Sequence, residues 1–283
     1  MSARAPSFQG LSVLVLESRR SREMASLVST YGGRPVVAPA LREVPLESNS
    51  DALAFADALV RDEFDIVILL TGVGTRALLA VVDSARGREA FVAALARTRV
   101  VARGPKPLAV LRELQVPVWV RVPEPNTWRE LVAAIDATGE SILGRRVAVQ
   151  EYGKSNDELL HELERRGARV TRVPVYRWAL PDDVEPLRAA VSAVARGELD
   201  AALFTTGVQV VHFMEVAGNL GQADAVRDGL RRMVVASIGP TTTEALRNQG
   251  IAADLEASHP KMGLLVREAA ERGPALLRRK RST

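Results

Sequence analysis

The sequence repeats itself once, in the same order, at a spacing of 134 to 135 residues. Three pairs of segments carry the repeat: residues 10–16 and 144–150, residues 65–72 and 200–207, and the Gly-Pro pairs at 104–105 and 239–240. Solenoid proteins repeat every roughly 20 to 50 residues, so this longer spacing indicates the duplication of a whole α/β half. The chain is therefore expected to fold into two similar domains.

Each half alternates short apolar runs with helical patterns. In the first half, strands are expected over residues 11–16, 65–70 and 99–102, each followed by a turn and a helix. Residues 35–39 are extended but contain two prolines, which favours an edge strand or a connector. Strands that alternate with helices form parallel sheets with helices on both faces. The fold class is therefore α/β, with two parallel-sheet domains.

The composition excludes several kinds of site and location. The 283 residues include no cysteine, which rules out disulfides, thiolate catalysis and cysteine-based zinc sites. The three histidines show no metal-ligand spacing, so we expect no metal centre. No apolar run approaches the roughly 20 residues that span a bilayer, and the first residues lack the apolar core of a signal peptide. We expect a soluble cytoplasmic protein without membrane contact.

The charge balance favours an anionic partner. The net charge is +4, and 34 of the 38 basic residues are arginine. The planar arginine fork pairs with carboxylate or phosphate groups through two hydrogen bonds. Acidic residues are interleaved along most of the chain and aromatic residues make up only 4% of it, so we expect no nucleic-acid binding through this region.

Residues 236–246 have the pattern of a buried strand that runs directly into a helix. Gly239 permits a tight or left-handed turn, and Pro240 presets φ for the first helical position. Thr241 and Thr242 then add hydroxyls to the unpaired backbone N–H groups at the positive end of the helix, which together can bind a carboxylate or phosphate. The alternative is ordinary helix capping by threonine, which needs no ligand.

Comparable turns are expected at three strand ends in each half. They pair as residues 17–21 with 151–156, residues 71–75 with 206–209, and residues 104–106 with 239–242. Ligands of parallel α/β sheets bind beyond the carboxyl ends of the strands. Two domains that face each other with these turns would form an interdomain cleft lined with N–H and O–H donors, which suits a large polyanion.

Four segments together resemble the uroporphyrinogen-III synthase (HemD-like) family of tetrapyrrole biosynthesis. They are Phe204-Thr205-Thr206 after Asp200, the turn at residues 237–246, residues 167–176, and Lys261-Met262-Gly263-Leu264-Leu265. The resemblance covers residues 10–272. One form of this family is fused to a C-terminal DNA-binding regulatory domain, and the resemblance extends to that form.

The resemblance implies two flavodoxin-like domains joined by a two-stranded antiparallel hinge, with the ladder at residues 36–44 and 170–178. The implied boundaries are domain 1 at residues 1–38 and 177–272, domain 2 at 46–167, the hinge at 39–45 and 168–176, and a basic tail at 273–283. The repeat alone places a boundary near Gly139. The discontinuous domain therefore comes from the resemblance.

The resemblance also implies a reaction. Hydroxymethylbilane, a linear tetrapyrrole rich in carboxylates, is cyclised to uroporphyrinogen III with loss of water and inversion of ring D. Such a lyase needs no cofactor, and a monomer is expected, with hydroxymethylbilane or uroporphyrinogen III in the interdomain cleft. Loss of the hydroxyl leaves a reactive azafulvene, so the enzyme mainly holds the substrate in a folded geometry.

The resemblance places the catalytic role on Tyr152, which would assist departure of the hydroxyl as an acid or through a water. The packing of an aromatic ring at a strand end is the alternative for this residue. Substrate contacts are expected from residues at the strand-end turns of both halves: Arg19, Thr71, Gly72, Gly104, Lys106, Lys154, Ser155, Asn156, Thr206, Gly207, Gly239, Thr241 and Thr242. For Thr206 the alternative is an N-cap.

Some residues depart from the family pattern. The family often has Thr-Arg-Pro after its first strand, whereas this chain has Glu17-Ser18-Arg19-Arg20, which places a carboxylate near a site for carboxylates. Lys106 replaces a threonine, and a lysine serves anions equally well. An alternative function is therefore a non-catalytic tetrapyrrole-sensing module of a transcriptional regulator whose DNA-binding domain is absent from this chain. A periplasmic solute-binding protein shares the two-domain plan, but no export signal supports it.

Overall fold

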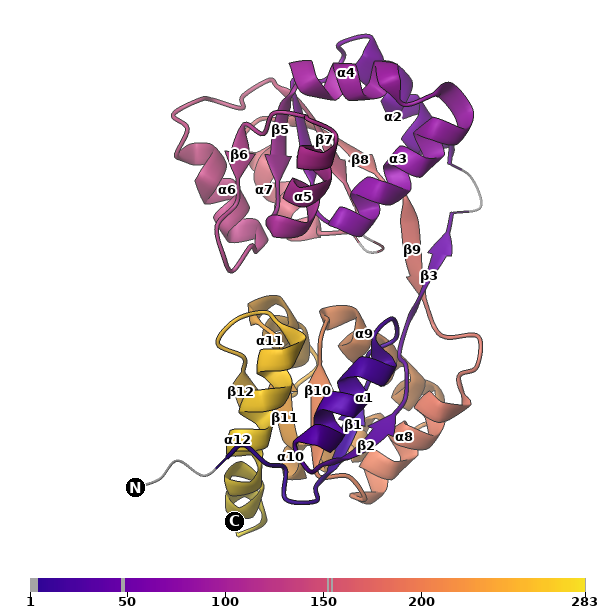
Figure 1. Cartoon of the computed structure of the whole chain (residues 1–283), viewed down its shortest axis with the longest axis vertical. Helices are drawn as coiled ribbons and strands as arrows, with labels where there is room; N and C mark the ends of the chain where they lie inside the picture. Colours follow the sequence, from indigo (N-terminus) through magenta and orange to yellow (C-terminus); the bar gives the residue numbers. More distant parts are fainter. Residues whose placement is uncertain (1–4, 47–48, 152, 154, 283) are drawn as a thin grey trace. The chain divides into compact units, whose positions relative to one another are not determined.

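The computed structural model describes residues 5–46, 49–151, 153 and 155–282. The chain divides into two compact units (Figure 1). Unit 1 combines the residues up to Arg42 with those from Ala179 onward, and unit 2 comprises Glu43–Trp178. The chain thus leaves unit 1 early, builds unit 2 from one continuous segment, and then returns.

Unit 1 is built on a five-stranded parallel sheet with the strand order β12-β11-β10-β1-β2. Its elements are β1 (Ser12–Val15), α1 (Ser21–Thr30), β2 (Arg34–Val37), α8 (Glu185–Arg196), β10 (Ala201–Phe204), α9 (Gly207–Asn219), α10 (Ala223–Arg232), β11 (Val234–Ser237), α11 (Pro240–Asn248), β12 (Leu255–Glu256) and α12 (Met262–Arg281). The proline-containing strand β2 lies at an edge of the sheet, which confirms the expectation for that segment.

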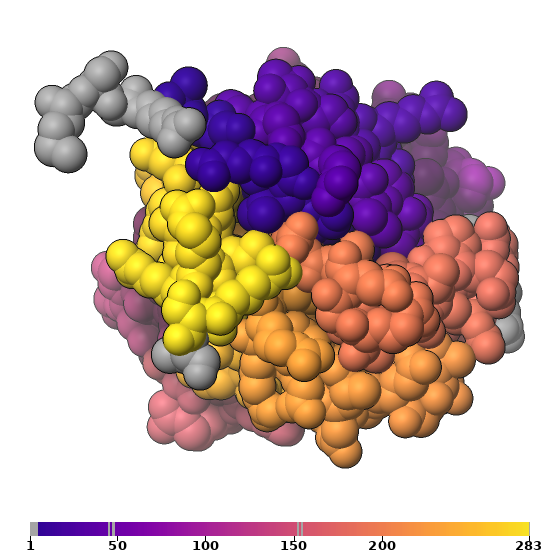
Figure 2. Space-filling view, turned by 90° about the horizontal axis from the view of Figure 1, so that it is seen from below, coloured from indigo at the N-terminus to yellow at the C-terminus, as the bar shows by residue number. Residues whose placement is uncertain are grey.

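Both faces of the unit 1 sheet are buried under helices. Leu14 and Phe204 face a core that also includes buried residues of α8, α9, α10 and α11. Val13 and Leu203 point to the opposite face, where they pack with residues of α1 and α12. Successive residues of a strand point to opposite faces, so strands buried on both sides are continuously apolar. Figure 2 shows the C-terminal segment (yellow) against the N-terminal one (indigo).

Unit 2 repeats this plan with the strand order β6-β5-β4-β7-β8, again parallel throughout. Its elements are α2 (Ser50–Val60), β4 (Ile66–Leu69), α3 (Gly72–Arg86), α4 (Glu89–Arg97), β5 (Arg99–Ala102), α5 (Pro105–Glu113), β6 (Val120–Arg121), α6 (Trp128–Asp136), β7 (Arg146–Gln150), α7 (Asp157–Arg165) and β8 (Arg169–Val173). Helices α2 to α5 contribute to the core on one face, and α6 and α7 to the core on the other.

The strands β3 (Arg42–Pro45) and β9 (Tyr176–Ala179) form a separate two-stranded antiparallel pair. The pair itself is confirmed, but the ladder expected at residues 36–44 and 170–178 is too long. Strand β2 pairs with β1 in the sheet of unit 1, and β8 pairs with β7 in the sheet of unit 2. The sheets therefore take the outer parts of the expected ladder, and a shorter pair remains.

The sequence led us to expect a separate basic tail at residues 273–283, but the described part of this segment, residues 273–282, belongs to α12 and its C-terminal cap. Helix α12 continues through Pro274 to Arg281, and the side chain of Leu277 is only 4% exposed. The ammonium of Lys280 donates to the backbone oxygen of Met233 at 2.6 Å and to Asp254 Oδ2 at 2.6 Å. Apolar burial and these charge-assisted bonds hold the end of the chain on unit 1.

In the described part of the chain, every helix is too short or too polar to cross a lipid bilayer.

Candidate functional site

The expected binding residues of unit 1 gather at the carboxyl edge of its sheet. Strands β1, β10 and β11 are neighbours and run parallel, so the turns that follow them lie side by side. These turns carry Arg19, Thr206 and Gly239, with Gly207 opening α9. Arg19 is exposed to solvent. In parallel α/β sheets this edge is the usual place for a ligand.

Thr206 caps α9, since its Oγ1 accepts a hydrogen bond from the backbone N–H of Val208 at 3.4 Å. Its hydroxyl proton remains available as a donor, because the cap uses only an acceptor lone pair. Gly207 is favoured by packing: a Cβ there would lie 3.0 Å from Ala245 Cβ on α11, which is a tight contact. Capping and ligand contact are therefore compatible at Thr206.

Gly239 does not adopt the left-handed turn that its sequence suggested. Its φ of 168° and ψ of 179° are extended, and a Cβ would only come within 3.7 Å of Pro260 Cβ. The strand enters α11 without needing a glycine, because the extended backbone is open to any residue and no close approach is involved. The backbone N–H groups of Thr242 and Thr243 both donate to the Gly239 oxygen at 3.0 Å.

The threonines after Pro240 do not cap α11, because the N-cap position before Pro240 is Gly239 and no side chain caps the helix. Thr241 is exposed, whereas Thr242 is only 3% exposed. The hydroxyl of Thr243 instead donates to the Glu256 carboxylate and lies 2.8 Å from Ser237 Oγ. Thr241 is thus the residue of the three that can offer its hydroxyl to a ligand.

Unit 2 places Thr71, Gly72, Gly104 and Lys106 at the corresponding edge of its own sheet. Thr71 caps α3 by accepting from the backbone N–H of Gly74 at 3.0 Å. A Cβ on Gly72 would lie 2.8 Å from the backbone oxygen of Lys106, so α3 and α5 need a glycine at this contact. Lys106 itself is exposed in the first turn of α5, where its charge can reach an anion.

Gly104 is the residue of this edge whose backbone conformation depends most on glycine. Its φ of +92° lies in a region that residues with a side chain rarely adopt, and a Cβ would meet Asn126 Oδ1 at 2.9 Å. The turn after β5 therefore depends on glycine, both for its backbone conformation and for the approach of Asn126.

The turn between β7 and α7 carries four of the expected residues, of which Tyr152 and Lys154 lie outside the described residues. Asn156 caps α7, because its Oδ1 accepts from the Leu159 N–H at 3.0 Å. Among the residues that the structure describes, the hydroxyl of Ser155 is buried and has no hydrogen-bond partner. A buried donor without a partner is costly, so this hydroxyl is a candidate donor to a ligand at the turn.

An ion pair between a buried carboxylate and an exposed guanidinium stands at the start of the same turn. Glu151 is 7% exposed, and its Oε1 accepts from Arg172 Nε at 2.8 Å. The hydrogen bond and the negative charge of Glu151 raise the pKa of Arg172 above its ordinary value. The carboxylate is therefore neutralised within unit 2.

Sequence reasoning missed three polar side chains of these edges: Thr205, Gln150 and Gln209. Both glutamines are 1% exposed, and both hydrogen-bond to the strand-end turns. The repeat contains a signal for them, since Gln209 occupies the position equivalent to Gly74. Where one half of the repeat has a buried polar residue and the other half has a glycine at the equivalent position, the side chain fills a space that is occupied differently in the other half.

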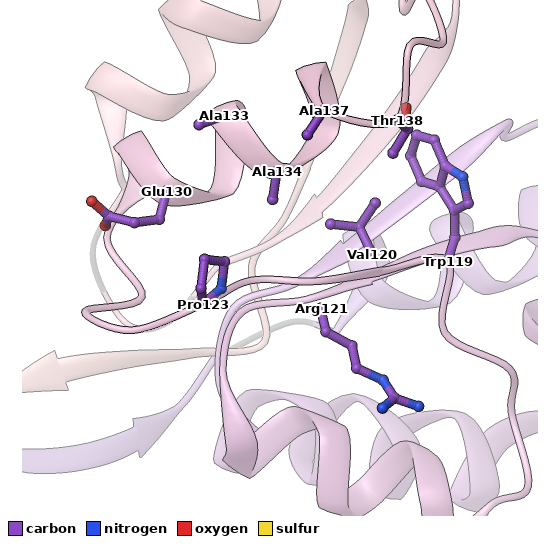
Figure 3. A pocket seen from close by; sticks show the side chains of 9 residues that line it. All are labelled: Trp119, Val120, Arg121, Pro123, Glu130, Ala133, Ala134, Ala137 and Thr138. Atoms are coloured by element: carbon purple, nitrogen blue, oxygen red, sulfur yellow. The ribbon is translucent and has the colours of Figure 1, made fainter.

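A cavity of about 500 Å³ lies elsewhere in unit 2, between β6 and α6 (Figure 3). Trp119, Pro123 and Ala134 contribute to its walls, while the Arg121 side chain points away from α6. The lining residues include none of those expected to bind substrate. Among the residues that the structure describes, no group of three or more His, Asp or Glu side chains is arranged to hold a metal ion.

Comparisons with known proteins cover both units. The family model "Uroporphyrinogen-III synthase HemD" matches residues 22–267. The crystal structures of uroporphyrinogen III synthase from Thermus thermophilus are similar to this chain. A mutant of that enzyme is 25% identical, with 94% of this chain and 100% of the other covered and a TM-score of 0.73. The wild-type enzyme is 27% identical, with 94% and 99% covered and a TM-score of 0.58.

A protein of Bacillus subtilis strain 168, "Uncharacterized protein YjjA", is 28% identical over 266 residues. The alignment covers 93% of this chain and 96% of that protein. The similarity therefore extends over nearly the whole length of both chains.

Proposed function

This chain belongs to the uroporphyrinogen-III synthase family, and from that premise we propose that it cyclises hydroxymethylbilane to uroporphyrinogen III with inversion of ring D and loss of water. The observation that carries the proposal is the family match over residues 22–267, because it spans most of both units and includes every strand-end turn except the one at residues 17–21. The proposed enzyme is a lyase that works without a cofactor.

The donors at the two carboxyl edges support a carboxylate-rich substrate. Thr206 and Thr241 offer hydroxyls in unit 1, and Lys106 and Ser155 offer an ammonium and a hydroxyl in unit 2. Each lies in or just before the first turn of a helix, where unpaired N–H groups and the helix dipole also favour anions. We propose that the substrate carboxylates bind at these positions.

Binding at these edges would serve the chemistry by orientation. Departure of the hydroxyl leaves an azafulvene at one end of the linear tetrapyrrole. The carbon with which it must form a bond belongs to the pyrrole at the other end of the substrate. Holding the two ends in a near-attack geometry can lower the barrier by about 7–11 kcal/mol in well-oriented systems. Position rather than strong acid or base catalysis is therefore the main contribution that we assign to the protein.

We assign to Tyr152 the task of helping the hydroxyl to leave, as an acid or through a water. The substitution Tyr152→Phe should then lower kcat with little change in KM, because the lost interaction acts in the transition state. Tyr152→Leu is the matched control for packing. Equal losses in both variants together with lower stability would assign Tyr152 to packing instead.

The function is tested by turnover of freshly made hydroxymethylbilane with chromatographic separation of the product isomers. Uncatalysed closure gives the type I isomer, so formation of the type III isomer in proportion to enzyme concentration is the expected result. Tight binding of uroporphyrinogen III without any type III product would refute the synthase proposal and favour a tetrapyrrole-sensing module.

A further inference from the structure

The carboxylate of Glu17 is bound to its own unit at the carboxyl edge. Its Oε2 accepts from the hydroxyl of Thr205 at 2.6 Å, and its Oε1 accepts from the backbone N–H of Arg20 at 3.3 Å. Glu17 follows β1 and Thr205 follows β10, so the first bond joins two neighbouring strand ends. An acidic residue in an anion-binding edge is thus tied down by local donors.

The buried amide of Gln209 completes the link from the other side. Its Oε1 accepts from the backbone N–H of Thr205 at 2.7 Å. Its Nε2 lies 2.8 Å from Thr205 Oγ1 and 3.2 Å from the Leu16 backbone oxygen, in donor geometry to both. Glu17, Thr205 and Gln209 therefore form a closed set of hydrogen bonds that joins the ends of β1 and β10.

These bonds assign different tasks to the two adjacent threonines. Thr205 gives its hydroxyl proton to Glu17 and accepts from Gln209, so it has no proton left to offer a substrate carboxylate. Thr206 uses its oxygen only as an acceptor for the Val208 N–H, so its proton is available. The backbone of Thr206 follows directly from that of Thr205, which the Glu17 and Gln209 bonds hold in place.

We propose that Glu17 is a positioning residue that holds Thr205 in place and thereby aims the hydroxyl of Thr206 at a substrate carboxylate. This inference rests on the proposed function for the identity of the substrate. It also explains a departure from the family pattern, because the carboxylate of Glu17 is used inside the edge and is not presented to the ligand.

The kinetic test uses Glu17→Ala with Glu23→Ala as the matched control. Glu23 is an exposed carboxylate on α1 that pairs with Arg20, so its removal changes the same charge without touching Thr205. Glu17→Ala should raise KM about tenfold and leave kcat within about twofold, since a carboxylate contact present before the reaction is lost. Glu23→Ala should leave both constants within about twofold.

Two further variants separate position from charge. Glu17→Gln keeps an oxygen that can accept from Thr205. On a logarithmic scale, its increase in KM should therefore be at most half of the increase caused by Glu17→Ala. In a Thr206→Val background, Glu17→Ala should have no further effect on KM, because its target is already gone. A KM of Glu17→Gln equal to that of Glu17→Ala, or fully multiplicative effects with Thr206→Val, would overturn the positioning role.

A measurement without substrate keeps this inference separate from the synthase proposal. Hydrogen exchange of the full chain, read by mass spectrometry over residues 204–209, should be at least about tenfold faster in Glu17→Ala than in Glu23→Ala. Unchanged exchange would overturn the role of Glu17 even in an active synthase. Faster exchange in a protein that makes no type III isomer would leave Glu17 as the positioning residue and refute only the synthase activity.

Discussion

The carboxyl edges of unit 1 and unit 2 each contain one buried glutamine amide, but the glutamine comes from different elements. In unit 1 it is Gln209 on α9, and in unit 2 it is Gln150 at the end of β7. The repeat places Gln209 opposite Gly74, and Gln150 opposite Leu16. A Cβ on Gly74 would lie 2.0 Å from Gln150 Nε2, so the two arrangements exclude each other within one unit.

The two amides do the same work. Gln209 accepts from the backbone N–H of Thr205, and Gln150 accepts from that of Thr71. Gln209 also donates to the backbone oxygen of Leu16 at the end of β1, whereas Gln150 donates to the backbone oxygen of Glu151, the residue that follows it at the end of β7. Strand ends in a buried turn leave backbone groups that need partners. Both units therefore need an amide at this edge, whereas the sequence position of the side chain that supplies it differs between them.

A second pair of equivalent positions lies at the opposite ends of the strands. Here too, the two units make the same interactions with residues from different elements. Asp65 and Asp200 each accept from a backbone N–H at 2.8 Å, given by Arg146 in unit 2 and by Ser12 in unit 1. Each also pairs with a guanidinium. Arg146 supplies it in unit 2, whereas Arg281 on α12 supplies it at 2.7 Å in unit 1.

The largest effect is expected when a second amide is forced into unit 2. Gly74→Gln should destabilise unit 2 by about 3 kcal/mol, because the new side chain must displace the buried amide of Gln150 and its hydrogen bonds. Adding Gln150→Leu recreates the unit 1 arrangement and should recover most of the loss. Trp119, Trp128 and Trp178 all lie in unit 2, so urea unfolding followed by tryptophan fluorescence measures it directly.

The matching control is Gln150→Leu alone, which removes the amide from unit 2 without supplying another. It should cost about 1–3 kcal/mol, since the Thr71 N–H loses its partner. A double variant less stable than Gly74→Gln would contradict the equivalence of the two amides.

The two Gly-Pro turns should differ next. Gly104→Ala should cost about 2–3 kcal/mol, because a side chain is strained at its φ of +92° and would press on Asn126. Gly239→Ala should stay within about 0.5 kcal/mol of the parent, because its backbone is extended and the space is open. Circular dichroism during urea unfolding follows both units. Equal losses of unfolding free energy in the two variants would contradict the dependence on the local backbone conformation.

The same turns allow a comparison of binding chemistry. Lys106 and Thr241 occupy equivalent positions after the Gly-Pro pairs. Thr241→Val with Thr242→Val should weaken uroporphyrinogen III binding by about 1–3 kcal/mol and change stability by less than about 0.5 kcal/mol, since neither side chain caps α11. Titration calorimetry and urea unfolding of the same variant measure the two quantities.

Lys106→Met should also weaken binding. The loss of affinity should become smaller as the salt concentration rises, because salt screens a point charge, whereas the loss in the threonine variant should not depend on salt. Normal affinity of the threonine variant would remove this turn from the binding site.

The smallest effect is expected for Asp65 and the stability of unit 2 at acid pH. The hydrogen bond from Arg146 lowers the pKa of Asp65 below its ordinary value. A carboxyl group with a lowered folded-state pKa contributes stability that is fully present above its unfolded pKa of about 3.9 and is lost as the pH falls through the folded value. Asp65→Asn should therefore cost about 1 kcal/mol at pH 7 and reduce the acid dependence of unit 2 unfolding below about pH 4. An unchanged acid dependence would contradict this assignment.

The sequence predicted those features that depend on local pattern. Apolar runs and helical periodicity indicated two parallel α/β sheets, and the prolines at residues 35–39 indicated an edge strand. The limits of the β3–β9 pair could not be read in this way, because β2 and β8 could pair either in the sheets or in the ladder, and tertiary packing decides between them. The end of α12 was mistaken for a tail because its partners, Asp200 and Asp254, are distant in sequence.

The candidate sites show the same division. Thr71, Thr206 and Asn156 occupy cap positions that local sequence rules identify. Gly239 was misread because its neighbours suggest a special turn, whereas the backbone dihedral depends on how β11 meets α11. The linkage of Glu17 to Thr205 joins residues 188 positions apart, and no local pattern contains that information.

The discontinuous make-up of unit 1 has a consequence for the order in which the chain folds during its synthesis. Strand β1 is synthesised before unit 2, yet one of its two partners, β10, ends only at Phe204. Unit 2, from Glu43 to Trp178, is one continuous segment and is complete before that partner exists. A nascent chain therefore carries β1 with β2 but without β10 while unit 2 forms, and the edge of β1 that later pairs with β10 must be kept from other pairings until synthesis has passed β10.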